Sequence, residues 1–393
     1  MKNILLKNCD LSGQIKDILI INNIITEIED NIDSDDAEVY NAEGHKVTPA
    51  FIDTHCHLRD PGFTHKEDIT TGTAAAFAGG YSAVVAMPNT NPVMDNPDTL
   101  DYVTSKAAYC KVYPTAAITV GQNGEELCDF ETLTAHGAVA FTDDGRPVAN
   151  AAMMYEAMKI CAEHGYLIMS HPEELSMGAN HLAEDLAIAR EIMIAEETGC
   201  RLHLAHVSTK TGMRLVREAK QRGVKVTCET CPHYFSFTKD ALSVYGANAK
   251  MNPPLRTQVD LEAVIEAIKD GTVDTISTDH APHTEAEKSV DLKSAPNGIT
   301  GLQTAFAAGI TNLVMPGHIT FDRLIELMAY NPAKILGIDV SIKVGNPANL
   351  NVIDETAQVT VNREDIKSKS FNTPFLGQVL YGKIIRSVTE YGI

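Results

Sequence analysis

Short apolar runs alternate with longer helical stretches from about residue 47 onward, and this alternation constrains the fold more than any other feature of the sequence. A strand that is apolar along its whole length is buried on both faces, as in a parallel sheet covered by helices. Eight such runs are present, at residues 47–54, 82–86, 112–118, 138–141, 167–169, 201–206, 225–229 and 274–277. Predicted helices between them include residues 70–78, 151–164, 182–198, 211–222 and 261–270. The pattern predicts an α/β fold with a TIM-like (β/α)₈ barrel, and a doubly wound open sheet is the alternative.

Both ends of the chain depart from this alternation and are β-rich. Short β-prone runs occur at residues 4–8, 17–21, 24–29, 350–353 and 379–386, separated by turn residues such as Ser12-Gly13. We therefore predict a small composite β-sandwich built from residues 1–48 and 341–393, and a barrel over residues 49–340. Two segments after the eighth strand, 299–314 and 321–330, are predicted to be helical.

The charge balance limits the possible partners. The 393-residue chain has 52 acidic and 32 basic residues, so its formal net charge is −20. A strongly acidic surface argues against nucleic acid and anionic membranes as partners, and an anionic substrate would need a metal ion or an arginine to reverse the field locally. We identify no membrane-spanning segment and no signal peptide. The eight cysteines lack the density of a disulfide scaffold, so we predict a cytoplasmic protein with reduced thiols.

The strongest local signal is Asp53-Thr54-His55-Cys56-His57, at the end of the first predicted barrel strand. Residues i and i+2 of a strand point to the same face, so the imidazoles of His55 and His57 can share one metal ion. The carboxyl ends of barrel strands form the catalytic face of such folds. Taken alone, the pair has an alternative interpretation as two ordinary histidines near a surface.

Other candidate ligands occupy equivalent strand ends. His171 ends the fifth strand and His206 the sixth, Asp279 follows the eighth, and Asp143 and Asp144 follow the fourth. Histidines with a purely structural role would not be expected to share this position at the ends of several strands. Six nitrogen and oxygen ligands suit two divalent ions, most simply Zn²⁺. Two such ions can bridge one water and lower its pKa toward about 7. Their repulsion requires a bridging carboxylate or carbamylated lysine, and the fourth strand offers Asp143 or Asp144 but no lysine.

Several further segments of the chain are recognisable sequence motifs. They are residues 53–62, 87–90, 141–145, 206–210, 250–256, 278–283 and 372–375. The most specific are Met-Asn-Pro-Pro-Leu-Arg at 251–256 and Thr-Asp-His-Ala-Pro-His at 278–283. Together they resemble the amidohydrolase superfamily of cyclic amidohydrolases, and specifically the class I dihydroorotases. The resemblance covers nearly the whole chain.

This resemblance implies a binuclear zinc centre. The implied ligands of one Zn²⁺ are His55, His57, Asp144 and Asp279, and those of the other are Asp144, His171 and His206. Asp144 and a hydroxide are implied to bridge the two ions, with Asp143 as the alternative carboxylate. Asp279 is implied to act as the general acid and base.

The resemblance also implies how a substrate is held. In this chain, Arg59, Asn89 and His283 match the family's residues that bind the substrate carboxylate. Asn252, Asn297 and Gly298 match the residues that contact the polar edge of the substrate ring. A guanidinium is well suited to a carboxylate, and Arg59 would supply the positive charge that an acidic protein needs. A salt bridge to Asp60 or Glu67 is the alternative role for Arg59.

The implied activity is that of a dihydroorotase of de novo pyrimidine biosynthesis, which reversibly cyclises N-carbamoyl-L-aspartate to L-dihydroorotate with loss of water. In the hydrolytic direction a zinc-bridged hydroxide attacks the cyclic amide, and Asp279 passes the proton to the leaving nitrogen. The resemblance further implies a homodimer and an association with aspartate transcarbamoylase. The alternatives are another cyclic-ureide hydrolase, of the allantoinase or hydantoinase type, and a catalytically silent subunit that supports aspartate transcarbamoylase.

Overall fold

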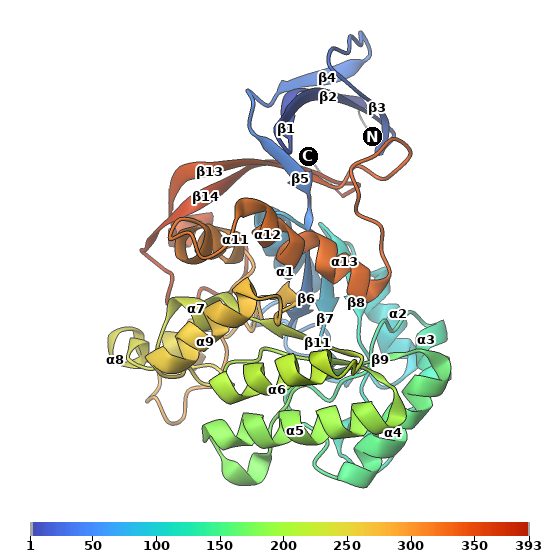
Figure 1. Cartoon of the computed structure of the whole chain (residues 1–393), viewed down its shortest axis with the longest axis vertical. Coiled ribbons are helices and arrows are strands. Elements are labelled where there is room, and N and C mark those ends of the chain that lie inside the picture. Colours follow the sequence, from blue (N-terminus) through green and yellow to red (C-terminus); the bar gives the residue numbers. More distant parts are fainter. Residues whose placement is uncertain (1–2, 392–393) are drawn as a thin grey trace.

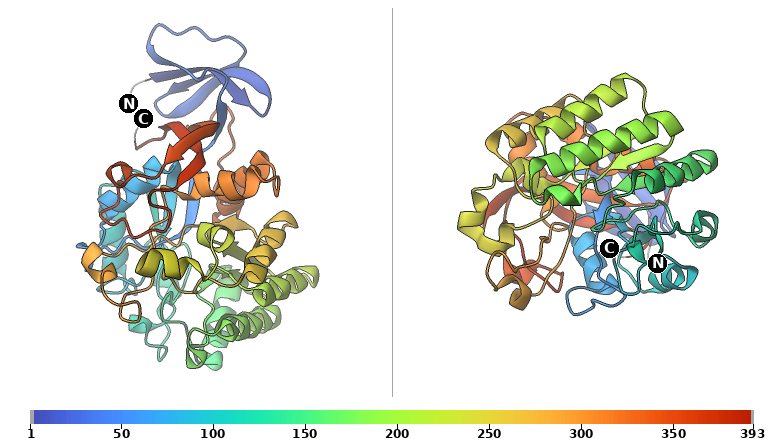
Figure 2. Two further views of the ribbon diagram at one scale, coloured as in Figure 1. Left: turned by 90° about the vertical axis from the view of Figure 1, so that its left-hand side faces the viewer. Right: turned by 90° about the horizontal axis from the view of Figure 1, so that it is seen from below.

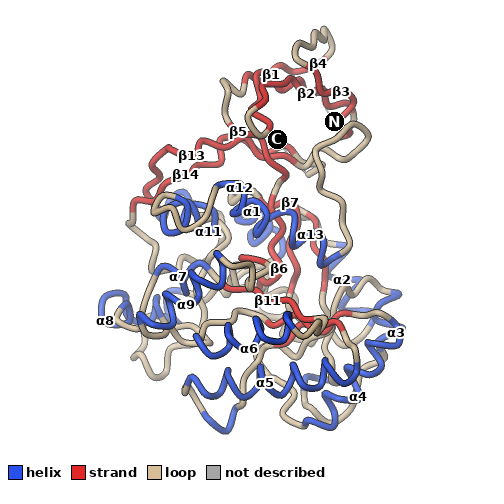
Figure 3. The backbone as a smooth tube through the Cα atoms, in the orientation of Figure 1, coloured by secondary structure: helices blue, strands red, loops and turns tan. Residues whose placement is uncertain are grey.

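The computed structural model describes residues 3–391, which form a helix-covered barrel with a β-sheet at one end (Figure 1). Both ends of the described part of the chain lie near that sheet, which stands above the barrel when the molecule is turned about its vertical axis (Figure 2). Strands are concentrated in this end sheet and in the centre of the barrel, and helices lie outside them (Figure 3).

Parallel strands form the barrel wall. In the described part of the chain these are β6 (Phe51–Cys56), β7 (Tyr81–Ala86), β8 (Lys111–Pro114), β9 (Leu167–Ser170), β10 (Arg201–Leu204), β11 (Val226–Thr230) and β12 (Thr275–Ile276). One sheet has the order β6-β7-β8 and the other β12-β11-β10-β9. Phe141 joins the two sheets through bridges to Ala116 and Ile168, and His280 closes the ring through a bridge to Cys56. The predicted barrel is therefore confirmed, and the open sheet is excluded.

Helices surround the barrel. The longer ones are α1 (Ile69–Ala78), α2 (Pro97–Ser105), α4 (Ala151–His164), α5 (His181–Thr198), α6 (Lys210–Gln221) and α9 (Gln258–Lys269). Shorter ones are α3 (Phe130–Ala135), α7 (Pro232–Ser236), α8 (Ala241–Tyr245), α10 (Glu285–Lys288), α11 (Ala305–Gly309), α12 (Phe321–Ile325) and α13 (Asn331–Leu336). The five helices predicted between strands are confirmed to within three residues. Their ends follow local rules, since Asn150 caps the first amides of α4 and Gly165, at φ 74°, ends it.

Some predicted elements of the barrel need correction. Residues 138–141 do not form a regular strand, because hydrogen bonds of Val139 and Ala140 reach only the β8 side and Phe141 alone is bridged to both neighbours. The helix predicted to begin at residue 299 begins at Ala305 instead. Ile299 is bridged to His280, so the residues before the helix continue the β-bridges that close the barrel.

The end sheet draws on both ends of the chain, as predicted for the β-sandwich. Its strands are β1 (Asn3–Leu11), β2 (Gln14–Ile21), β3 (Ile24–Glu29), β4 (Ala37–Asn41), β5 (Lys46–Pro49), β13 (Leu350–Thr360) and β14 (Val379–Val388). They follow the order β14-β13-β5-β1-β2-β3, with β4 beside β1. The run 47–54, predicted as one strand, is split at Ala50. The amide of Ala50 still donates to the Asn349 carbonyl next to β13 of the end sheet, whereas the amide of Phe51 donates to the Gly80 carbonyl next to β7 of the barrel. The domain boundaries at 48/49 and 340/341 stay a prediction, and their outermost residues 1–2 and 392–393 lie outside the described chain.

All eight cysteines are unpaired and buried, which agrees with the prediction of reduced thiols. Within residues 3–391, the helices are too short or too polar to cross a bilayer.

Phe51 anchors the barrel core where β6 begins. Its ring is fully buried, stacks on Phe306 at 5.2 Å and meets Tyr81 edge-on at 5.7 Å. Aromatic contacts of this kind add to the free energy gained by burying the ring. Because β6 carries the first two candidate ligands, this packing also fixes the strand that presents them.

Phe51→Ala should lower the free energy of unfolding by about 3–5 kcal/mol, because it removes buried contacts and leaves a cavity. Urea denaturation of the full chain measures the change. Val259→Ala, at a position that is 55% exposed on α9, is the control and should shift stability by no more than about 0.5 kcal/mol. Equal effects of the two changes would contradict this account of the core.

Candidate metal centre and active-site cavity

The candidate ligands lie together at the carboxyl ends of the barrel strands. His57, His171, His206 and Asp279 follow β6, β9, β10 and β12, and Asp144 follows the Phe141 bridge. Two of these positions have positive φ, +38° at His206 and +45° at Asp279. Non-glycine residues rarely adopt this left-handed backbone, and they do so mainly in turns and at functional sites. The backbone thus turns these side chains inward just beyond the strands.

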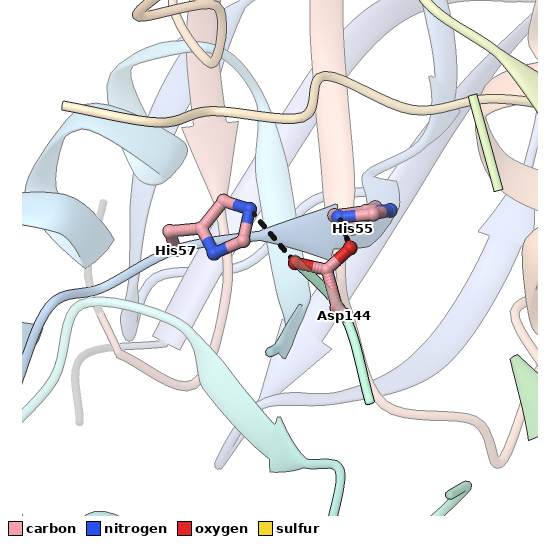
Figure 4. Close-up of side chains that lie close together, drawn as sticks. All are labelled: His55, His57 and Asp144. Atoms are coloured by element: carbon pink, nitrogen blue, oxygen red, sulfur yellow. Dashed lines mark ion pairs between the residues drawn. The ribbon is translucent and has the colours of Figure 1, made fainter. Parts of the chain in front are cut away.

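His55, His57 and Asp144 form the first metal-ligating group. His55 Nε2 lies 3.4 Å from Asp144 Oδ1, and His57 Nε2 lies 3.5 Å from Asp144 Oδ2. Figure 4 shows both imidazoles directed at the carboxylate. Asp279 Oδ1 is 3.1 Å from His57 Nε2 and 3.7 Å from His55 Nε2. A tetrahedral ion with bonds of about 2.1 Å separates its ligands by about 3.4 Å, so these distances fit one shared cation.

Asp144, His171 and His206 form the second group. His171 Nδ1 lies 3.4 Å from Asp144 Oδ1 and 2.8 Å from His206 Nε2, and His206 Nε2 is 4.0 Å from Asp144 Oδ1. The members of each group are buried, and their ligand atoms lie within 4.8 Å of one another. Because Asp144 belongs to both groups, the arrangement is that of a binuclear metal site with a shared carboxylate.

The contacts of Asp143 and Asp144 show which of these two aspartates is the carboxylate shared by the two metal-ligating groups. Asp143 accepts hydrogen bonds from the amides of Ile118 and Thr119 and from the Thr119 hydroxyl, so its carboxylate is used in the loop after β8. Burial raises the pKa of Asp144, but the charge of His55 and the hydrogen bond with His171 bring it well below the usual range. Asp144 is therefore the ionised carboxylate at the centre of the cluster.

The donor set fits divalent cations. His55 Nε2 is a buried nitrogen without a hydrogen-bond partner among residues 3–391, although His55 Nδ1 lies 2.8 Å from Glu229 Oε1. A buried polar atom without a partner is costly, and a bound metal ion would supply the partner that this nitrogen lacks. Buried carboxylates also gather here, since Asp144, Asp279 and Glu229 are each less than a tenth exposed. Positive ions would balance their charge.

Glu229, in β11, is a functional residue that the sequence analysis missed. Its carboxylate is fully buried and accepts hydrogen bonds from Thr54 Oγ1 at 2.6 Å, His55 Nδ1 at 2.8 Å and His203 Nε2 at 3.1 Å. A carboxylate behind a ligating histidine fixes its tautomer and leaves the other nitrogen free to bind a metal. The sequence signal is a single acidic residue in a strand whose other residues are uncharged.

Two other ligand rings have comparable contacts on the side away from the cluster. His57 Nδ1 lies 2.9 Å from Asn89 Oδ1, and Asn89 Nδ2 donates to Asp144 Oδ2 at 3.2 Å. His171 Nε2 lies 3.0 Å from Glu173 Oε2. Asn89, predicted to bind the substrate carboxylate, thus also braces two of the candidate ligands.

A cavity of about 240 Å³ adjoins the cluster. Pockets for drug-sized ligands measure about 300–1,000 Å³, so this one suits a small molecule. All the predicted substrate-binding residues line it, namely Arg59, Asn89, Asn252, His283, Asn297 and Gly298. The predicted metal ligands line it as well, except for His55. A larger cavity of about 710 Å³ lies between the end sheet and α12, but neither metal-ligating group of the described residues is there.

One end of the smaller cavity is positively charged. Arg59 Nε donates to the Pro282 carbonyl at 3.3 Å, and Lys66 Nζ lies 3.5 Å from His283 Nδ1. Burial and the charges of Arg59, Lys66 and Lys288 lower the pKa of His283 to about 3, so its ring is neutral near pH 7. This end of the cavity can therefore receive an anion in a protein of strongly negative net charge.

The alternative salt-bridge role for Arg59 is not seen. Within residues 3–391, no ion pair joins Arg59 to Asp60 or Glu67, because Asp60 accepts from the Tyr102 hydroxyl and Glu67 pairs with His280. The φ of Arg59 is +60°, which turns its side chain out of the β6 direction.

A close backbone approach forms the wall beside His283. Asn297 contributes its carbonyl, which accepts from His283 Nε2 at 2.8 Å. Gly298 has a φ of +126°, and a Cβ there would lie 2.8 Å from the Ala281 carbonyl oxygen. Only glycine fits this position, so the backbone of 297–298 itself borders the cavity.

Comparisons with known proteins agree with this geometry. A family model described as Dihydro-orotase-like matches residues 44–179. A dihydroorotase of Ruminiclostridium cellulolyticum is 45% identical over 392 residues, covering 94% of this chain and 92% of the relative. A dihydroorotase of Geobacter metallireducens is 46% identical with the same coverage. Among solved structures, L-hydantoinase (dihydropyrimidinase) from Arthrobacter aurescens has a TM-score of 0.91 at 25% identity, covering 99% of this chain and 95% of that structure.

The barrel, the end sheet and the two histidine–aspartate groups define a metal-dependent cyclic amidohydrolase. Within that class the identity to curated relatives is high along almost the entire chain. The chain belongs to the dihydroorotase family.

Glu229→Gln tests the contact behind His55. A glutamine presents one acceptor oxygen and one NH₂ group, so it cannot accept from all three donors that face the carboxylate. We expect Zn²⁺ to bind about 10- to 100-fold more weakly, as measured by competition with a chromophoric chelator.

Thr54→Val is the matched control, because it removes one donor and leaves the carboxylate in place. It should weaken Zn²⁺ binding less than Glu229→Gln does. Unchanged affinity in a folded Glu229→Gln variant would contradict the role of this carboxylate.

Proposed function

We propose that the chain catalyses the reversible hydrolysis of L-dihydroorotate to N-carbamoyl-L-aspartate, with ring closure and loss of water as the biosynthetic direction. One observation carries the proposal: a single small cavity has a shared-carboxylate metal site at one end and Arg59 at the other. A cyclic substrate that holds both an amide and a carboxylate matches the two ends.

The substrate is held mainly by groups beyond the metal site. Its carboxylate pairs with the guanidinium of Arg59, a charge-assisted contact, and lies against neutral His283 and Asn89. Asn252 and the backbone of Asn297-Gly298 contact the polar edge of the ring. These contacts support a specific orientation, with the ring amide directed toward Asp144 and Asp279.

Two Zn²⁺ ions held by His55, His57, Asp144, Asp279, His171 and His206 would supply an acidified water and a Lewis acid for the amide oxygen. The carboxylate of Asp144 lies between the two histidine pairs, where its negative charge would offset the repulsion between two bound cations. His55 and His57 are kept in fixed tautomers by Glu229 and Asn89.

Asp279 moves the proton. Burial raises its pKa, but the hydrogen bond with His57 and the charges of His55 and His57 lower it to about 2, so the carboxylate is ionised at neutral pH. In hydrolysis it accepts a proton from the attacking water as the new C–O bond forms. It then returns that proton to the ring nitrogen as the C–N bond breaks.

The other candidate functions lack these supports. A hydantoinase- or allantoinase-type ring carries no carboxylate that needs Arg59, and the aspartate at the fourth strand replaces the lysine expected there. A silent subunit has no need of complete ligand groups, whereas both groups are complete here.

Assembly and location stay predictions. Exposed Leu186 and Met193 on α5 support a homodimer that covers this face. Light scattering after gel filtration tests the homodimer, and co-elution tests the predicted association with aspartate transcarbamoylase. The cytoplasmic location follows from the sequence prediction alone.

Asp279→Asn should reduce turnover of L-dihydroorotate by about 100-fold or more, because the amide keeps the size of the side chain but cannot accept the proton. Zinc content is measured alongside, since Asp279 also borders the first metal group. A zinc-loaded variant with near-normal turnover would refute the proton-transfer role.

Arg59→Met should separate the candidate substrates. It removes the charged contact to the carboxylate while retaining much of the side-chain volume, so kcat/KM for L-dihydroorotate should fall about 10- to 100-fold. Dihydrouracil, which has the same ring without the carboxylate, serves as the matched substrate. The variant's kcat/KM for dihydrouracil should change little. If both substrates lost activity equally, Arg59 would not bind the carboxylate.

A further inference from the structure

The connection between β13 and β14 reaches the active-site cavity. It leaves the end sheet and runs down the side of the barrel (Figure 3). Its residues 368–372 contact two loops that border the cavity. One loop, residues 59–68, carries Arg59, and the other, residues 281–298, carries His283 and Gly298.

Asn372 holds the second loop through its side-chain amide. It is 4% exposed, its Oδ1 accepts from the amide of His283 at 3.0 Å, and its Nδ2 donates to the carbonyls of Ala281 at 3.2 Å and Gly298 at 3.0 Å. The Asn372 carbonyl also accepts from the amide of Thr300 at 2.9 Å. One side chain therefore satisfies three backbone groups on opposite sides of the loop.

The residues just before Asn372 hold the first loop. Ser370 Oγ donates to the Lys66 carbonyl at 2.7 Å, and Lys369 Nζ donates to the Thr64 carbonyl at 2.8 Å. The amide of Lys369 donates to Glu67, which is fully buried. A short segment from the end-sheet connection thus fixes both walls of the positively charged end of the cavity.

We infer that Asn372 is a positioning residue for substrate recognition, an inference that rests on the proposed function. It holds the wall of His283 and Gly298 at a set distance from Arg59, and so determines the affinity for the carboxylate and the ring edge. It lines neither the cavity nor the metal cluster and touches no reacting atom.

The chemistry of the amide makes this role specific. An aspartate has nearly the same shape and can still accept from the His283 amide, but it cannot donate to the two carbonyls. Unpaired buried carbonyls favour rearrangement of the loop. Because Gly298 already approaches Ala281 closely, a small shift of this backbone changes the width of the cavity.

The test compares Asn372→Asp and Asn372→Ala with wild type in steady-state hydrolysis of L-dihydroorotate. We expect KM to rise at least tenfold in both variants, with a smaller change in kcat and wild-type zinc content. A side chain that contributed only to stability would, when replaced by aspartate, lower the melting temperature and leave KM unchanged. Equal KM values in Asn372→Asp and wild type would therefore overturn the inference.

Asn351→Asp is the matched control. Asn351 is also buried, donates from Nδ2 to the Gly80 carbonyl at 2.8 Å and accepts from Ser387 Oγ at 2.7 Å, but it lies in β13, away from the cavity. The control should lower the melting temperature and leave KM unchanged. Ser370→Ala, a milder change in the same segment, should fold normally and raise KM about threefold.

Hydrogen exchange separates this inference from the proposed function, because it needs no substrate. Peptides covering residues 281–300 should lose protection in Asn372→Asp and keep it in Asn351→Asp. Unchanged protection would overturn the positioning role. Absence of turnover in zinc-loaded wild type would instead refute the proposed function.

Discussion

The buried carboxylate of Asp144, shared by two pairs of histidines, is the interaction on which the rest of the structure depends. An ionised group in a protein interior is tolerated only with partners, and Asp144 has imidazole nitrogens of three histidines within 3.5 Å. These histidines come from strands far apart in sequence. Only a closed barrel brings residue 55 and residue 206 to the same point, so the site cannot form before the ring is complete.

The negative net charge of the chain opposes the binding of an anionic substrate, and positive charge within the cavity offsets this repulsion. A net charge of −20 repels an anionic substrate. Cations held by the histidine–aspartate groups would create one positive region of the small cavity, and the guanidinium of Arg59 provides another. Burial and the neighbouring basic groups keep His283 neutral, so its ring adds no further positive charge among those groups.

Much of this arrangement follows from sequence because it depends on periodicity. The apolar runs gave the order of barrel strands. The positions of the strand ends identified the four histidines of the two metal-ligating groups, and they left Asp143 and Asp144 as alternatives until the family resemblance favoured Asp144. Interactions between distant segments could not be predicted in this way. Glu229 reaches His55 across the barrel interior, and Asn372 reaches His283 from the connection between two strands of the end sheet. Residues 372–375 form a recognisable motif, but nothing in that motif shows which distant groups its side chains contact. The bend at Ala50 was missed for the same reason, since the apolar run continues unbroken while its hydrogen bonds pass from one sheet to another.

The most direct test of the central claim is a titration of Zn²⁺ into the metal-free chain while turnover of L-dihydroorotate is followed. The shared-carboxylate site predicts negligible turnover without metal and a rise to a plateau at two Zn²⁺ per chain. Full turnover by the metal-free protein, or none after two Zn²⁺ have bound to the folded chain, would contradict the account.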